Sequence, residues 1–213
     1  MGVEANALKR GWKAWLHAWL LEKLVEHYNQ LTRTRKQALM NLVSDRVLEI
    51  GAGCGANLDF LDPRQVLWVA TDINAHALRR ARQRALRAGL RAQFCYALSE
   101  CLPFPEAAFD AVICTLVLCS VRDPLRALRE AWRVLKPNGR LVFVEHVAAA
   151  SGTRLRAWQE RLAPLWAGFT DGCRLNQETW HWLERVDFQE LRIEHFSLPL
   201  PLVGPHIAGY GIK

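Results

Sequence analysis

Short apolar runs alternate with longer stretches of mixed polarity from about residue 45 onwards. Runs of about four to eight aliphatic and β-branched residues bounded by turn residues are typical of buried strands, whereas apolar positions spaced three and four apart indicate helices. Strands that alternate with helices are typical of a parallel sheet with crossover helices, so we expect an α/β fold. The predicted strands cover 46–51, 66–71, 92–96, 109–115, 139–146, 190–196 and 206–212, and the predicted helices cover 56–61, 74–88, 123–135 and 176–186.

Two segments stand outside this alternation. Residues 5–40 predict a helical region whose large apolar side chains gather on one side, and residues 150–175 form an insertion between the fifth and sixth predicted strands. The concentration of aromatic rings there has three interpretations: a cover over an apolar substrate pocket, ordinary packing of helices on the sheet, or contact with a membrane surface. The tryptophans in or just after these segments are Trp12, Trp15, Trp19, Trp158, Trp166, Trp180 and Trp182.

A glycine-rich turn follows the first predicted strand. Val47–Ile50 runs directly into Gly51, Gly53 and Gly55. Glycine tolerates positive φ and has no Cβ, so the strand can turn sharply while bare backbone N–H groups approach a ligand. Asp72 ends the next apolar run about 20 residues later, where a carboxylate can accept both hydroxyls of a ribose. The pattern predicts a nucleotide-binding turn.

The turn alone leaves the cofactor open. Gly51, Gly53 and Ala56 also satisfy the dinucleotide fingerprint, so a nicotinamide enzyme is an alternative. Glu49, two residues before the first glycine, favours a cationic amino-acid moiety because a carboxylate there would repel a pyrophosphate. Glycines that only make a tight strand-to-helix turn are a third interpretation, which the position of Asp72 disfavours.

Composition limits the classes of protein that fit. At 213 residues, with 51% hydrophobic and 23% charged residues, the chain is expected to form one globular domain and not a disordered region. The sequence has no apolar stretch of about 18 residues and no signal-peptide pattern, so we expect a cytoplasmic protein.

The net charge of +7 fits either a solvated helix face or an anionic partner. No aromatic residues interleave with the arginines to stack bases, so we expect a solvated face and no nucleic-acid partner. The six cysteines form no C-x-x-C pair and are expected to be reduced and mostly buried. No group of histidines, cysteines or carboxylates has metal-ligand spacing, so no metal is predicted. The arginines that contribute to the basic stretch are Arg79, Arg80, Arg82, Arg84, Arg87 and Arg91.

Four motifs together resemble the class I S-adenosylmethionine (SAM) methyltransferases over residues 45–213. They are the Glu49–Gly55 loop, Asp72, the stretch Leu102–Asp110, and Leu135–Arg140 before a strand. The resemblance implies SAM as cofactor and a Rossmann-like fold, with a seven-stranded, mostly parallel sheet, an antiparallel last strand and flanking helices. In the single domain 1–213 it implies an N-terminal helical cap over 1–44, a SAM-binding half over 45–147 and a substrate-side half over 148–213.

A closer resemblance is to the methyltransferase-like seven group of alkyl-thiol S-methyltransferases. It is carried by Cys114–Val121, Glu145–Val147, Asp171–Cys173 and Gly204–Tyr210. It implies methyl transfer from SAM to a small, apolar acceptor, namely a thiol. The alternatives are a C- or O-methyltransferase on a quinone-like or lipid acceptor, and a non-catalytic SAM-fold partner subunit. The chain lacks the long hydrophobic anchor of membrane-bound members, which leaves peripheral membrane contact through the N-terminal helix as an alternative.

The resemblance also implies a division of roles among the cofactor-binding residues. Backbone of the glycine turn would lie against the methionyl part of SAM, Glu49 would support its ammonium group, and Asp72 would hold the ribose. Leu98 stands where many class I enzymes have an acidic adenine contact, so that contact would fall to Ser99 or to backbone. The implied cofactor-binding set is Glu49, Gly51, Ala52, Gly53, Gly55, Asp72, Ile73, Ser99, Glu100, Thr115 and Leu116.

Two histidines are candidate catalytic bases. Ligands of open α/β sheets lie outside the carboxyl ends of the strands, which places His146 near the transferred methyl group. The last strand runs antiparallel in this fold, so its first residue, His206, begins on the same side. Either imidazole could take the proton of an acceptor thiol near neutral pH, and a purely structural role is the alternative for each. Cys173 is interpreted as a packing residue, because direct displacement needs no enzyme nucleophile.

Overall fold

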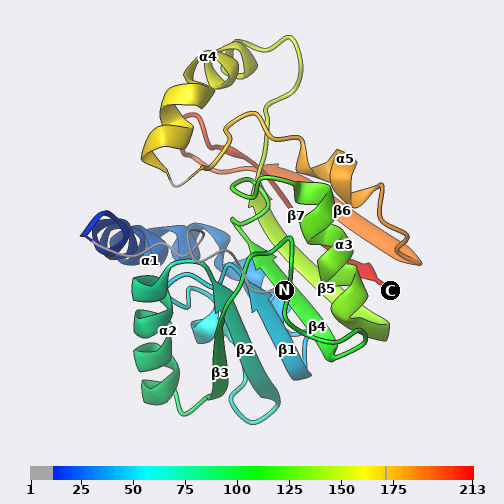
Figure 1. The fold of residues 1–213 in the computed structure, drawn as a ribbon. Helices are drawn as coiled ribbons and strands as arrows, with labels where there is room; N and C mark the ends of the chain where they lie inside the picture. Colours follow the sequence, from blue (N-terminus) through cyan, green and yellow to red (C-terminus); the bar gives the residue numbers. More distant parts are fainter. Residues whose placement is uncertain (1–11, 171) are drawn as a thin grey trace.

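Seven strands form one mixed sheet in the order β3-β2-β1-β4-β5-β7-β6 (Figure 1). The computed structural model describes residues 12–170 and 172–213. All neighbouring strands are parallel except β7, which is antiparallel to both β5 and β6. The predicted sheet, with its single antiparallel last strand, is confirmed. The strands are β1 (Asp45–Ile50), β2 (Val66–Asp72), β3 (Arg91–Tyr96), β4 (Phe109–Thr115), β5 (Leu135–His146), β6 (Glu190–Ser197) and β7 (Pro205–Ile212).

Helices cover both faces of the sheet. One core cluster joins the sheet to α1 and α2, and a second joins the opposite face to α3 and α5. Apolar side chains alternate between the two clusters along each inner strand, so both faces are buried and the strands are apolar throughout. The helices are α1 (Trp12–Met40), α2 (Ala75–Arg87), α3 (Pro124–Val134), α4 (Arg154–Phe169) and α5 (Thr179–Leu183), with a 3-10 turn η2 at Leu58–Phe60.

Three predicted elements differ from the structure in extent. The helix expected over 56–61 is only the turn η2, because the turn that begins at the glycines continues to Asn57. β5 begins at Leu135 instead of 139, since Leu135 pairs with Phe109 before a register shift that contains Asn138 at a φ of 63°. The helix expected over 176–186 is the shorter α5.

The two outlying segments are both helical. α1 packs on the sheet, and α4 follows the carboxyl end of β5 and stands beyond the sheet at the top of Figure 1. Trp180 and Trp182 pack against the core, as expected if these rings serve in ordinary packing of helices on the sheet. The side chains of Trp12, Trp15 and Trp19 lie outside the described part of the structure, so membrane contact through them stays a prediction. Among the described helices, none is long and apolar enough to cross a membrane.

At Gly209 in β7 there is no room for a side chain against β6. A Cβ built there would collide with the backbone carbonyl of Arg192 and lie 2.9 Å from the Phe143 ring. Because neither backbone nor a packed ring can move away cheaply, Gly209→Ala is expected to lower the free energy of unfolding by about 1–3 kcal/mol in urea titrations. Gly168→Ala in α4 is the control, since no heavy atom lies within 4 Å of that Cβ. Equal unfolding midpoints for the two variants would contradict the packing argument.

Candidate active site

The predicted site residues gather at the edge of the sheet where the parallel strands end. Asp72 ends β2, Thr115 ends β4 and His146 ends β5. β7 runs the other way, so His206 near its start lies opposite His146 in register. This edge is where ligands of open α/β sheets bind.

The glycine turn adopts backbone conformations that few other residues tolerate. Gly51, Gly53 and Gly55 have φ values of 63°, 53° and 78°. A Cβ on Gly51 would also collide with Val117, whereas the Cβ direction at Gly53 has no heavy atom within 4 Å. The turn is held against β2, since the N–H of Ala52 donates to the Thr71 carbonyl at 2.9 Å. Its backbone therefore borders open space at Gly53.

Asp72 connects the glycine turn to the start of α2. Its Oδ2 accepts the N–H of Gly53 at 2.8 Å and its Oδ1 accepts the N–H of Asn74 at 2.7 Å. Ile73 lies between these contacts and, like Asp72, is partly exposed. Each carboxylate oxygen can accept more than one hydrogen bond, so the same group can also receive two ribose hydroxyls.

Glu49 is buried beneath the turn and does not lie on its surface. Its Oε1 accepts from Asn57 Nδ2 at 2.9 Å and its Oε2 accepts from Trp68 Nε1 at 2.8 Å. Burial raises the pKa of Glu49 to about 7, against the opposing effect of these hydrogen bonds and of the Lys36 charge. The carboxyl group can support a ligand through Asn57, whose buried Oδ1 has no partner among the described residues.

Helix α1 docks on the glycine turn through two polar residues that the sequence analysis did not single out. Asn29 Nδ2 donates to the carbonyl of Ala56 at 2.8 Å, and the fully buried Lys36 donates from Nζ to Asn29 Oδ1 at 2.8 Å. Burial lowers the pKa of Lys36 to about 8. The seven-residue spacing of these two residues, which puts them on one helix face, was the available signal.

The turn after β3 is tied to the loop before α3. Ser99 and Glu100 are partly exposed, and an isolated bridge joins Leu98 to Cys101. Glu100 Oε1 accepts the N–H of Arg122 at 2.9 Å. Both residues follow the carboxyl end of β3, and the Glu100 carboxylate already has a backbone partner.

The loop after β4 is shaped by a buried carboxylate. Thr115 Oγ1 accepts a hydrogen bond from Asn57, and Leu116 has a φ of 53°. Glu145 Oε1 accepts the N–H groups of Val117 and Leu118 at 2.9 and 3.1 Å. Burial raises the pKa of Glu145 to about 7. Glu145 therefore fixes the backbone of the loop that closes this side of the site.

An aromatic cluster surrounds His206. Its ring centroid lies 5.7 Å from that of Tyr28 in α1 and 6.3 Å from that of His146. His206 Nδ1 lies 2.8 Å from the carbonyl of Gly204, to which it donates. Burial lowers the pKa of His206 to about 4, so the ring is neutral at pH 7. Within the described residues, His206 Nε2 and the Tyr28 hydroxyl are buried without a partner.

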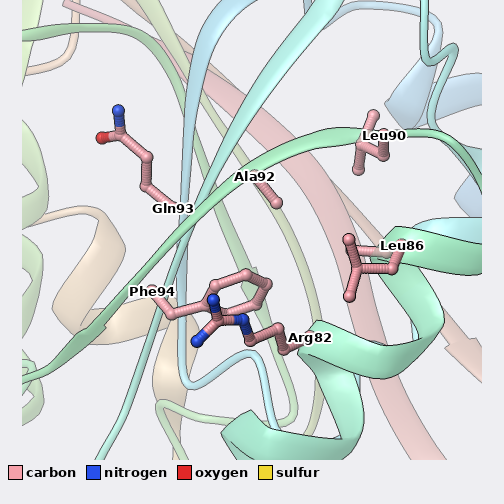
Figure 2. A pocket seen from close by; sticks show the side chains of 7 residues that line it. Arg82, Leu86, Leu90, Ala92, Gln93 and Phe94 are labelled. Atoms are coloured by element: carbon pink, nitrogen blue, oxygen red, sulfur yellow. The ribbon is translucent and has the colours of Figure 1, made fainter.

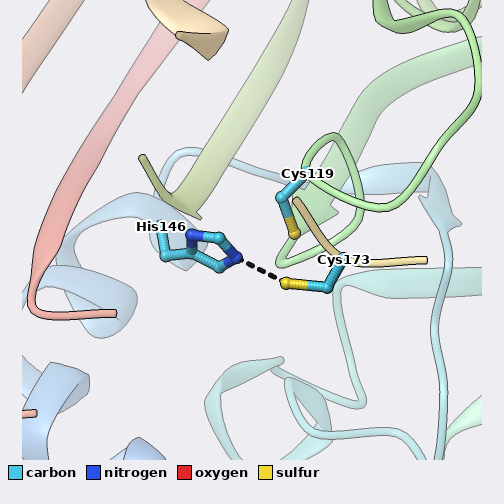
Figure 3. A group of neighbouring side chains, drawn as sticks. All are labelled: Cys119, His146 and Cys173. Carbon is cyan, nitrogen blue, oxygen red and sulfur yellow. Dashed lines mark hydrogen bonds between the residues drawn. The ribbon is translucent and has the colours of Figure 1, made fainter. Parts of the chain in front are cut away.

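The second histidine belongs to a sulfur-rich group (Figure 3). His146 Nε2 lies 2.8 Å from Cys173 Sγ, and Trp166 Nε1 donates to the same sulfur at 3.3 Å. Cys119 completes the group. Hydrogen bonds from Cys119, His146 and Trp166 lower the pKa of Cys173 to about 4, and the Cys119–Cys173 interaction raises the pKa of Cys119 well above its usual value. The sequence predicted only a packing role for Cys173, but its sulfur also makes polar contacts with His146 and Trp166.

A hollow of about 430 Å³ lies between α2 and β3 (Figure 2). It is open to solvent and lined by residues such as Arg82, Leu86 and Phe94. None of the predicted site residues lines it, so it is separate from the candidate active site.

Residues 48–143 match the family described as methyltransferase domain. The fold resembles the YcgJ protein of Bacillus subtilis, with a TM-score of 0.65 and 18% identity over 85% of this chain and 98% of that one. A SAM-dependent methyltransferase of Thermotoga maritima gives a TM-score of 0.64 at 19% identity, over 93% of this chain and 99% of that one. With the glycine turn and Asp72 at the carboxyl edge of the sheet, the chain is a SAM-dependent methyltransferase.

The chain also matches human thiol S-methyltransferase TMT1A, at 35% identity over 94% of this chain and 87% of the relative. Rat thiol S-methyltransferase TMT1B is 35% identical over 92% of this chain and 85% of its own length. The chain belongs to the family of these thiol S-methyltransferases.

The residues present fit SAM. The glycine turn offers backbone beside open space at Gly53, Asp72 is partly exposed, and the buried Oδ1 of Asn57 has no partner within the described ranges. The partly exposed Asp72 carboxylate suits the ribose of SAM, and the buried Glu49 carboxylate suits its cationic amino-acid end.

Proposed function

We propose that the chain methylates the sulfur of a small, apolar thiol. Two relatives that it matches over most of its length are named thiol S-methyltransferases. The observation in the chain itself that carries the proposal is the pair of buried polar atoms, His206 Nε2 and Tyr28 Oη, that find no partner among the described residues. Leaving such atoms unpaired costs about 1–3 kcal/mol each, so a ligand that satisfies them is favoured there.

The cofactor would lie along the strand ends. Glycine-turn backbone would receive the methionyl part, Glu49 would act on its ammonium group through Asn57, and Asp72 would accept the ribose hydroxyls. Ser99 and Glu100 would flank the adenine, and Thr115 with Leu116 would border the sulfonium. Glu49 departs from the sequence prediction in one respect, since its buried carboxylate would not touch the ligand directly.

SAM, when bound, supplies an activated methyl group on a positively charged sulfur. The chain needs no oxyanion hole for such a displacement. What its residues would provide is a water-excluded place that holds the acceptor at attack distance, an effect that can supply about 7–11 kcal/mol. Helix α1 contributes on both sides, since Asn29 contacts the glycine turn and Tyr28 contacts the His206 ring.

His206 would receive the hydrogen of the acceptor thiol. Its Nδ1–H donates to Gly204, which leaves Nε2 as a hydrogen-bond acceptor, and its lowered pKa keeps the ring neutral. His146, the other predicted base, has its Nε2 against Cys173. The geometry therefore favours His206 as the group that orients the S–H.

His206→Asn is expected to lower turnover of an alkyl thiol about 10²-fold at pH 7 while SAM affinity stays nearly unchanged. The loss should shrink as pH approaches the thiol's own pKa, because a thiolate needs no hydrogen-bond acceptor. Turnover is measured with methyl-labelled SAM and a panel of thiols, and SAM affinity by calorimetry. His195→Asn in β6, where the ring lies 5.4 Å from Trp180, is the control.

A loss that stays constant from about pH 7 to 9.5 would contradict the thiol hydrogen bond to His206. Failure of every thiol with the wild-type protein, combined with turnover of a quinol or lipid, would move the reaction to a carbon or oxygen acceptor. SAM binding without turnover of any acceptor would favour a non-catalytic partner subunit.

A further inference from the structure

We propose that Cys119, His146 and Cys173 bind a thiophilic divalent cation such as Zn²⁺, whose fourth coordination position takes the acceptor thiol. The proposal rests on thiol methylation as the reaction and adds the means by which the acceptor becomes a thiolate. Two cysteines and one histidine with an open position form a donor set that catalytic zinc uses in proteins.

The three ligand atoms are already close together. Cys119 Sγ, the His146 ring nitrogen and Cys173 Sγ all lie within 4.8 Å of one another (Figure 3). Zinc–sulfur bonds of about 2.3 Å and zinc–nitrogen bonds of about 2.0–2.1 Å in a tetrahedron separate the ligand atoms by roughly 3.5–3.8 Å. Small side-chain rotations would convert the one arrangement into the other.

The backbone around the three residues is fixed by independent contacts. The Cys119 N–H points to Glu145 Oε2 at 3.4 Å, and His146 is paired with His206 in the sheet. The N–H of Arg174 donates to the carbonyl of Cys119 at 2.9 Å, which ties the chain after Cys173 to the loop after β4. Three segments far apart in the sequence are therefore joined where the ligands meet, so the site is preorganised.

The surroundings match those of metal-bound thiolates. Trp166 Nε1 donates to Cys173 Sγ, and such N–H to sulfur contacts orient and stabilise ligating cysteines. Glu145 is buried beside the cluster, with its Oε2 3.4 Å from the Cys119 N–H. As metal ligands the two cysteines would be thiolates, whose negative charge a divalent cation would offset.

The location gives the cation a chemical role. His146 lies next to the His206 cluster and Cys119 lies three residues after Leu116, so the three ligands lie beside the proposed acceptor position. A thiol that coordinates a cation of this kind loses its proton, which His206 Nε2 would accept and pass on to solvent. The thiolate sulfur then forms a bond to the methyl carbon of SAM as the bond from that carbon to the sulfonium sulfur breaks, and the electron pair stays on the departing sulfur. The neutral thioether product is a weak ligand and dissociates.

Metal content of the full chain tests the site directly. We expect about one equivalent of zinc per chain by elemental mass spectrometry, removable by a chelator and restored by ZnCl₂. Cys119→Ser and Cys173→Ser should each lower zinc affinity by more than about 100-fold, and Trp166→Phe by about 10- to 100-fold with the ligands intact. Cys95→Ser in β3 is the matched control and should keep full zinc content.

Cobalt substitution provides a readout that does not depend on turnover. The Co²⁺ form is expected to show thiolate-to-metal charge-transfer absorption. This absorption should be absent from folded Cys173→Ser protein. In the wild type it should change when an alkyl thiol is added without SAM. A Cys119–Cys173 disulfide with no bound metal, or full thiol methylation in metal-free protein, would overturn the proposal and leave thiol methylation standing. Stoichiometric zinc on these ligands without turnover of any thiol would instead contradict the proposed reaction.

Discussion

Replacing Asp72 with alanine is expected to weaken SAM binding by about 1.5–3 kcal/mol, which is roughly 10- to 150-fold in Kd. The carboxylate would lose its charge-assisted bonds to the two ribose hydroxyls, and the glycine turn would lose its tether at the Gly53 N–H. Calorimetry with SAM measures the change.

Asp62→Ala is the matched control for that experiment. Asp62 Oδ1 also accepts a backbone N–H, from Arg64 at 2.9 Å, but it precedes β2 and so lies at the opposite end of that strand. Its replacement should leave SAM affinity unchanged. If Asp72→Ala is folded by thermal melting and binds SAM as the wild type does, Asp72 is not part of the cofactor site.

The stability advantage of the wild type over Glu49→Gln is expected to be about 2.5 kcal/mol smaller at pH 8 than at pH 5. Burial raises the pKa of Glu49 from 4.5 to about 7 in the folded protein. Between those values the folded state holds a proton that the unfolded chain releases. The contribution of Glu49 to the free energy of unfolding is therefore full below about pH 4.5 and is lost as the pH rises through 7.

The comparison with Glu49→Gln isolates one group. The lowered pKa values of His206 and Cys173 act in the opposite direction, so the pH profile of the wild type alone does not report on Glu49. Urea unfolding of both proteins without SAM, at several pH values between 5 and 8, gives the difference. A difference that is independent of pH would show that Glu49 has an ordinary pKa in the folded state.

The sheet and the cofactor turn could be predicted because their signals are local. Val47–Ile50 and the glycines after it specify a strand and a turn within one short stretch, and each later apolar run specifies its own strand. The register shift at Asn138 could not be predicted from the sequence, because residue type alone only weakly indicates a positive φ in a residue other than glycine.

The sulfur-rich group could not be predicted for the opposite reason. Cys119, His146 and Cys173 have no motif spacing, and they meet only because Glu145 shapes one loop and Arg174 is bonded to it. The buried position of Glu49 was also missed, since its burial depends on Trp68 in the next strand and on Lys36 in α1. Contacts between distant segments decide both.

The position of β7 in the chain implies an order in which the sheet is completed during synthesis. β7 lies between β5 and β6 in the sheet, yet it follows both in the chain. The five strands that hold the cofactor turn can pair as they leave the ribosome, whereas β6 has no neighbour until β7 has been made. His206 therefore reaches the site after every other residue assigned to it, and a nascent chain that can already bind the methyl donor would still lack its acceptor side.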